Sequence, residues 1–78
     1  MSVTVRYFAS LRDAAGVAEE TVPVPASLPA LYEALQARHG FAIGRERLRV
    51  AMDGHFVEWN APVADGAEVV FIPPVSGG

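Results

Sequence analysis

The stretch that decides the fold is Glu68-Val69-Val70-Phe71-Ile72, in a sequence of 78 residues. Its length and its β-branched and aromatic side chains favour a strand over a helix. The run is apolar almost throughout, which is typical of a strand buried on both faces at the centre of a sheet. We therefore expect residues 68–72 to form a central strand.

Two further strands are predicted nearer the start of the sequence. Residues 2–8 alternate apolar and polar side chains, which indicates a strand with one buried face. Its core-facing residues are expected to be Val3, Val5 and Tyr7, and its other face carries Thr4, Arg6 and Phe8. Residues 19–24 predict another strand, and Pro23 places it at an edge because proline cannot donate to a ladder.

One long helix is predicted after the second strand. Ser27 is a typical N-cap residue, and Pro29 is tolerated in the first turn. Apolar residues then recur at helical spacing, namely Leu28, Leu31, Tyr32 and Leu35. Gly40 is the expected C-cap. The alanine-rich residues 9–16 indicate a shorter helical turn or a loop.

The segment between this helix and residue 68 predicts a hairpin. Residues 44–47 are expected to form an exposed loop, and residues 48–52 a strand. Asp53-Gly54 is a hairpin turn signal, and residues 55–58 return as a short strand.

The predicted fold class is α+β, with a mixed sheet covered by one main helix in the order ββαβββ. A strand hairpin, a crossover helix and returning strands are typical of the β-grasp, or ubiquitin-like, arrangement. In it the first and last strands are central, adjacent and parallel. We expect a β-grasp domain over residues 1–72 and an extended tail over residues 73–78. An antiparallel α+β sandwich with another strand order fits the pattern as well.

Composition narrows the classes of function. Hydrophobic residues make up 51% of the sequence, which predicts a packed core rather than disorder. The net charge of −3 does not favour a nucleic acid partner, and no apolar run is long enough to span a membrane. We expect a cytoplasmic protein. Arginines occupy three alternate positions and form a basic stripe, Arg45, Arg47 and Arg49. Such a stripe is either a solvated surface or a binding site for an acidic partner or an anionic substrate.

The sequence contains no evident catalytic set. There is no cysteine, and no nucleophile, base and orienting residue form a recognisable group. His39 and His55 are expected to be solvated surface residues, and two histidines without thiolates predict no metal site. We therefore expect a carrier or a partner protein, not an enzyme by itself.

Three apolar residues are candidates for an exposed surface patch. In the first predicted strand, Phe8 points to the face opposite that of Tyr7. In the strand over residues 55–58, Phe56 points to the face opposite that of Val57. Ile72 directly precedes the tail. If the first and last strands are neighbours, Phe8 and Ile72 should lie close together. Such residues either form an exposed patch that marks a protein interface or close the end of the core.

The tail ends in Gly77-Gly78 after Pro73-Pro74. Glycine has no Cβ, so this ending could thread a narrow channel and offer an unhindered acyl carbon. Extended, residues 73–78 would reach roughly 20 Å. The alternative is an inert, frayed end.

The string Pro73-Pro74-Val75-Ser76-Gly77-Gly78 after Asp65-Gly66-Ala67-Glu68-Val69 resembles the small, sulfur-carrying subunit of molybdopterin synthase. The segments Tyr7-Phe8-Ala9 and Leu11 to Gly16 are similar to the same family. The resemblance covers the whole sequence.

It implies that a ubiquitin-activating-type enzyme adenylates Gly78 with ATP and magnesium, and that sulfur supplied by a sulfurtransferase then gives a thiocarboxylate. In this family the tail inserts into the large synthase subunit and donates sulfur to cyclic pyranopterin monophosphate, in a heterotetramer. No cofactor is expected to be bound stably. Gly77 gives clearance, and the resemblance assigns partner binding to Phe8, Phe56, Ile72, Pro73, Pro74, Val75 and Ser76.

Rival interpretations remain. The chain could carry sulfur for thiamin thiazole, tRNA thiolation or cysteine synthesis. It could also be a ubiquitin-like modifier that forms isopeptides, or an interaction domain with an inert tail.

Overall fold

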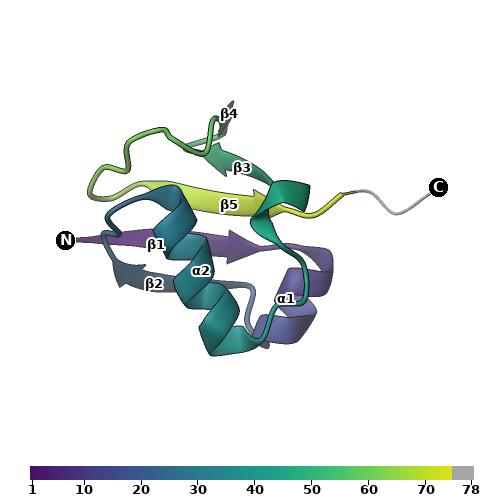
Figure 1. Cartoon of the computed structure of the whole chain (residues 1–78). Helices are drawn as coiled ribbons and strands as arrows, with labels where there is room; N and C mark the ends of the chain where they lie inside the picture. Colours follow the sequence, from purple (N-terminus) through teal and green to yellow (C-terminus); the bar gives the residue numbers. More distant parts are fainter. Residues whose placement is uncertain (75–78) are drawn as a thin grey trace.

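The computed structural model describes residues 1–74, which form a five-stranded mixed sheet with one long helix packed on one face (Figure 1). The strands are β1 (Ser2–Tyr7), β2 (Glu19–Pro23), β3 (Arg49–Met52), β4 (His55–Val57) and β5 (Glu68–Ile72). The helices are α1 (Ala9–Ala15), α2 (Leu28–His39) and the short 3-10 helix η1 (Arg45–Arg47). The strand order is β2-β1-β5-β3-β4.

Strand β5 occupies the centre of the sheet, as its apolar sequence predicts. It runs parallel to β1, with Tyr7 opposite Phe71, and antiparallel to β3, with Val50 opposite Phe71. Strand β2 lies at one edge, as Pro23 predicts, and β4 lies at the other. The β-grasp arrangement, with the first and last strands adjacent and parallel, is confirmed.

The expectation that β5 is buried on both faces is wrong. Val69 and Phe71 are fully buried, whereas Val70 and Ile72 are only half-buried. A single helix of this size covers one face of the sheet, and within residues 1–74 no second layer covers the other. We call the face opposite α2 the open face.

Helix α2 begins and ends at the predicted residues. Ser27 Oγ accepts a hydrogen bond from the Ala30 N–H at 3.1 Å, and satisfies a backbone donor that the first turn leaves without a partner. Gly40 closes the helix in the left-handed conformation, with φ of 72°, and its N–H donates to the Gln36 carbonyl at 2.8 Å. The predicted apolar stripe is buried, and consists of Leu28, Leu31, Tyr32 and Leu35.

Aromatic side chains fill the space between α2 and the sheet. The Tyr32 ring meets the Phe71 ring edge-on, with centroids 5.2 Å apart. Trp59 stacks on Phe71 at 5.7 Å, so Phe71 lies between two rings. The Tyr32 hydroxyl donates to the Ile43 carbonyl at 2.6 Å, which ties the segment after α2 to the core. Burial raises the pKa of Tyr32, and the charge of Glu46 adds to the rise.

Two connections flank β3: the segment before it and the turn that joins it to β4. Residues 45–47 form the 3-10 helix η1 instead of the expected loop, because the Arg47 N–H bonds to the Gly44 carbonyl at 3.0 Å. The predicted Asp53-Gly54 turn is present, with φ of 53° and 86°. Asp53 also exchanges two hydrogen bonds of 2.9 Å with the backbone of Glu68, so the hairpin is fixed to β5.

Candidate docking face

The open face of the sheet carries side chains that the core does not use. Because successive residues of a strand point to opposite faces, the buried Val69 and Phe71 leave Val70 and Ile72 on the open face. Strand pairing sets Val70 beside Ala51 and Arg6, and Ala51 beside Phe56. A row of residues from β4 to β1 therefore crosses this face.

Phe8 lies at the end of β1, where the chain turns into α1. It is the N-cap of α1, in an extended conformation, and 50% of its surface is exposed. Its carbonyl accepts the Leu11 N–H at 3.1 Å, and the next residue, Ala9, has a left-handed φ of 51°. This backbone fixes a large apolar side chain in solvent instead of folding it into the core.

Phe8 and Ile72 leave the sheet at neighbouring positions. Tyr7 pairs with Phe71 in the parallel ladder, so the next residues of the two strands, Phe8 and Ile72, lie at the same level. Ile72 is half-buried, and Pro73 and Pro74 follow it outside regular structure. Phe8 and Ile72 are thus next to the start of the tail.

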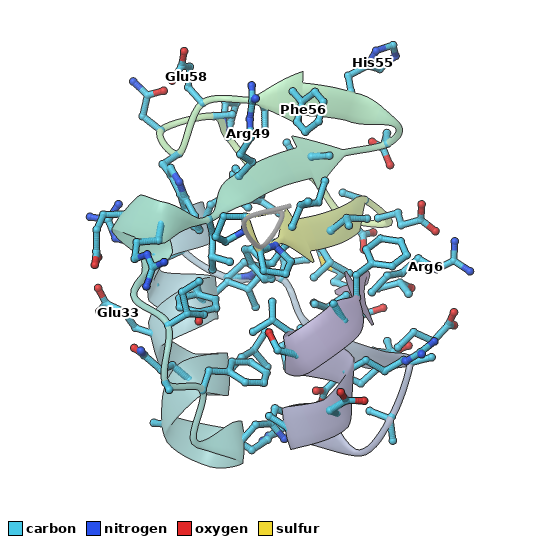
Figure 2. The ribbon with its side chains drawn as sticks, turned by 90° about the vertical axis from the view of Figure 1, so that its right-hand side faces the viewer. Arg6, Glu33, Arg49, His55, Phe56 and Glu58 are labelled. Atoms are coloured by element: carbon cyan, nitrogen blue, oxygen red, sulfur yellow. The ribbon has the colours of Figure 1, made fainter. Side chains whose placement is uncertain are left out.

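Phe56 belongs to the same face but not to the same cluster. It is 61% exposed at the β4 edge. Arg49, which pairs with Ile72 across β3 and β5, holds its guanidinium carbon 4.5 Å from the centre of the Phe56 ring (Figure 2). Arg49 therefore lies between the two apolar parts. Sequence reasoning placed Arg49 in a stripe but missed this contact, which depends on the β3–β4 register.

A groove of about 320 Å³ opens beside this contact, lined by residues of β3, β4 and the turn after β4, among them Arg49, Phe56 and Trp59. Arg45 approaches Trp59 in the same way, at 5.5 Å. Two of the three predicted stripe arginines thus lie over aromatic rings, and only Arg47 is in open solvent without such a ring.

A polar cluster lies away from the open face, between β1, β2 and the end of α2. The Glu20 carboxylate accepts hydrogen bonds from the Tyr7 hydroxyl and from Arg38 Nη1, the latter at 3.0 Å, and lies 2.6 Å from His39 Nε2. The His39 side chain is only 14% exposed. The prediction that His39 is a solvated surface residue is therefore wrong, whereas His55 is exposed.

The cluster shifts the pKa of two of its members. Burial of Glu20 would raise the pKa of its carboxyl, but the hydrogen bonds from Tyr7 and His39 outweigh burial and hold the pKa below the ordinary 4.5. Burial, together with the hydrogen bond to Glu20, raises the pKa of Tyr7 well above its ordinary value. The carboxylate therefore stays charged and the phenol stays neutral, which suits a structural cluster rather than an acid or base.

The candidate site leaves several predicted residues outside the structure. Val75, Ser76, Gly77 and Gly78 lie beyond the described residues 1–74. Within residues 1–74, no three His, Asp or Glu side chains come together to hold a metal ion. In that same part of the chain, every helix is too short or too polar to cross a membrane.

Solved structures share this fold. SAMP1 from Haloferax volcanii has a TM-score of 0.80 at 26% identity, covering 100% of both chains. A putative molybdopterin converting factor, subunit 1, from Pyrococcus furiosus has a TM-score of 0.78 at 31% identity, covering 96% of this chain and 99% of that one. A third structure is a complex of subunits 1 and 2 of molybdopterin-converting factor from Helicobacter pylori, with a TM-score of 0.72, 26% identity and 100% coverage of both chains.

Sequence relatives point the same way. The chain is 35% identical over 82 residues to the human molybdopterin synthase sulfur carrier subunit, covering 97% of this chain and 93% of that protein. It is 32% identical over 83 residues to the same subunit of Escherichia coli (strain K12), covering 97% and 99%. The resemblance seen in the sequence is confirmed. Residues 5–78 match the ThiS family, and the chain belongs to that family.

Proposed function

We propose that this chain is the sulfur carrier subunit of molybdopterin synthase and acts in molybdenum cofactor biosynthesis. The observation that carries the proposal is the similarity to two such subunits over nearly their full length. The Helicobacter pylori complex of subunits 1 and 2 supports a large subunit as the partner. The proposed assembly is a heterotetramer in which the large subunit catalyses and this chain delivers sulfur.

The reacting group in this proposal is the Gly78 carboxylate. An α-carboxylate has a pKa of roughly 3.5 and is an unreactive anion at neutral pH. A ubiquitin-activating-type adenylyltransferase removes this obstacle: a carboxylate oxygen attacks the α-phosphorus of magnesium-bound ATP, and pyrophosphate leaves. Sulfur held as a persulfide on a sulfurtransferase then attacks the acyl carbon and AMP leaves, after which a thiol cleaves the S–S bond and is itself oxidised to a disulfide.

The resulting thiocarboxylate carries the sulfur into the large subunit. There the sulfur bonds to a carbon of cyclic pyranopterin monophosphate, and water then cleaves the acyl–sulfur bond, so that Gly78 returns as a carboxylate. Two such transfers build the dithiolene. Gly77 supplies clearance because it has no Cβ, and Pro73 and Pro74 stiffen the exit from β5. This chain needs no stably bound cofactor in the cycle.

The proposed docking face is made of apolar side chains on the open face, which we define as Phe8 and Ile72 beside the tail and Phe56 at the β4 edge. Half or more of the surface of Phe8 and Phe56 is in solvent, and Ile72 directly precedes Pro73. A partner that covers these residues would receive the tail at the same time. In this proposal the partner also contacts the tail itself, at Pro73, Pro74, Val75 and Ser76.

The tail is tested by changing only its last residue. Deletion of Gly78, or addition of one residue after it, is expected to abolish sulfur transfer, because the acyl group is then absent or displaced. Thermal unfolding should be unchanged, since residues 1–74 form the core. The carrier proposal fails if the extended protein is thiocarboxylated and active without being cleaved.

The docking face is tested by Phe8→Asp. Calorimetry with the large synthase subunit is expected to show a loss of affinity of about tenfold or more, because the charge cannot be desolvated there. The matched control is Ala34→Glu, which adds a charge at an exposed position of α2, on the other side of the sheet. Unchanged affinity for Phe8→Asp would remove Phe8 from the interface.

A protein modifier is the second candidate, favoured by the similarity to SAMP1, the small archaeal modifier protein 1 of Haloferax volcanii. Carriers for thiamin thiazole, tRNA thiolation or cysteine synthesis remain alternatives within the same chemistry. Mass spectrometry of the chain isolated from its own cells distinguishes them. Exchange of one oxygen for sulfur at Gly78 supports a carrier, whereas adducts to lysines of other proteins support a modifier.

A further inference from the structure

Two arginines lie on the open face, and their charges have different surroundings. Arg6 is paired with Glu19 at 3.4 Å and with Glu68 at 3.7 Å, so its charge is offset within the sheet. Arg49 has no carboxylate within 4.0 Å among residues 1–74, and its guanidinium rests on the Phe56 ring at 4.5 Å. The charge of Arg49 is thus held in place and available to a partner.

We propose that Arg49 is a specificity-determining residue of the docking face, and that the partner surface covering this face presents an Asp or Glu side chain to it. The proposal rests on the proposed function, because it needs a partner that covers Phe8, Ile72 and Phe56. It names the chemistry of that partner: an apolar surface with a carboxylate opposite Arg49.

The position of Arg49 between the apolar residues makes this requirement strict. It pairs with Ile72 on one side and covers Phe56 on the other, so a partner that buries both also removes water from the guanidinium. A desolvated charge without a counter-charge costs far more than an exposed one. A partner with an apolar or basic group at this point is therefore rejected, and a carboxylate can accept the two parallel N–H bonds of the guanidinium fork.

The aromatic ring adds to the selectivity. A guanidinium stacked on a ring is already restricted before the partner arrives, so less side-chain entropy is lost when it pairs. The surrounding charges favour a single carboxylate over a polyanion. Glu58 lines the same groove as Arg49 and Phe56, and would repel a chain of phosphates. Nucleic acid binding requires several uncompensated cations along one surface.

The experiment compares Arg49→Gln with Arg47→Gln in the full-length chain. Both changes remove one positive charge from an exposed arginine, but Arg47 has no ring beneath it and lies on η1. Affinity for the large molybdopterin synthase subunit of the same organism is measured by calorimetry at low and at high salt. Arg49→Gln is expected to weaken binding about tenfold and to flatten its salt dependence, whereas Arg47→Gln should change affinity about twofold or less.

Phe56→Leu separates the ring from the apolar surface. Leucine keeps the apolar contact but removes the ring that holds the guanidinium. We therefore expect Phe56→Leu to lose more affinity than Arg47→Gln and less than Arg49→Gln. Equal affinities for Arg49→Gln and Arg47→Gln would overturn the inference. If Ile72→Asp also leaves affinity unchanged, the docking face itself is refuted. If Ile72→Asp weakens binding and Arg49→Gln does not, only the role of Arg49 is refuted.

Discussion

Replacement of Glu20 by alanine tests the polar cluster that joins β1, β2 and α2. The carboxylate has three partners, Tyr7, Arg38 and His39, and its side chain is 18% exposed. Alanine removes all three interactions and leaves the hydroxyl of Tyr7, a residue that is only 2% exposed, without its acceptor. The variant should therefore fold but be clearly less stable.

The magnitude follows from the burial of each partner. The hydrogen bond from Tyr7 to a charged acceptor contributes about 1.5–3 kcal/mol. The ion pair with Arg38 adds at most about 1 kcal/mol, because the Arg38 side chain is 62% exposed and screened by water. We expect Glu20→Ala to lower the free energy of unfolding by about 2–4 kcal/mol at neutral pH. For a domain of this size, that lowers the melting temperature by roughly 8–30 °C.

The assay is urea unfolding, followed by circular dichroism, as a function of pH. The native pKa of Glu20 lies below its ordinary value of 4.5, so its contribution is complete above about pH 5 and is lost as the pH falls through the native pKa. The stability difference between wild type and Glu20→Ala should therefore shrink as the pH falls from about 5 toward 3.

The matched control is Glu19→Ala on the same strand. Glu19 pairs with Arg6 at 3.4 Å, but both side chains are about half exposed, so this change should cost less than about 1 kcal/mol. A double-mutant cycle with Tyr7→Phe should give a coupling energy of at least about 1 kcal/mol. The reasoning is refuted if Glu20→Ala and Glu19→Ala are equally stable at pH 7, or if the effect of Glu20→Ala does not depend on pH.

Three other substitutions test local features of the fold. Ser27→Ala removes the N-cap of α2 and should lower the unfolding free energy by about 1 kcal/mol in urea titrations. Phe71→Ala empties a fully buried position between two rings and should cost about 3–5 kcal/mol, visible as a loss of near-ultraviolet circular dichroism at moderate temperature. Ala9→Gly relieves a φ of 51° and should leave the melting temperature unchanged or raise it, in contrast to a glycine placed inside a helix.

The sequence predicted the elements well because their signals are local. The caps of α2, the Asp53-Gly54 turn and the apolar run of β5 each depend on a few adjacent residues. Burial of β5 on both faces could not be judged in this way. It depends on how many layers cover the sheet, and residues 1–74 supply only α2 on one side.

Contacts between distant segments explain the other differences. His39 is the last residue of α2, where a basic residue is usually solvated, but the fold brings it to Glu20, which lies 19 positions away. The contact of Arg49 with Phe56 depends on the register of a hairpin. The sequence left two alternatives for Phe8 and Phe56, an exposed patch or the closed end of the core. Both side chains are exposed, which favours the patch.

The register of β1 links the stability of the domain to the shape of its docking face. Tyr7 and Phe8 are adjacent, yet one points into the polar cluster and core and the other into solvent, and a slip of one residue would exchange them. Hydrogen bonds at the opposite end of the strand prevent this slip. The Ser2 N–H donates to Asp65 Oδ1 at 2.9 Å, and the Ser2 carbonyl accepts the Gly66 N–H at 2.7 Å.

The same loop leads directly into β5, so the bonds to Ser2 set β1 and β5 in register at one end of the sheet. At the other end, this common register places Phe8 beside Ile72, at the start of the tail. Because the polar cluster around Glu20 and the docking face lie on opposite sides of β1, substitutions can weaken either one without directly touching the other. A loss of affinity with unchanged melting temperature therefore reports on the face, and a loss of stability with unchanged affinity reports on the cluster.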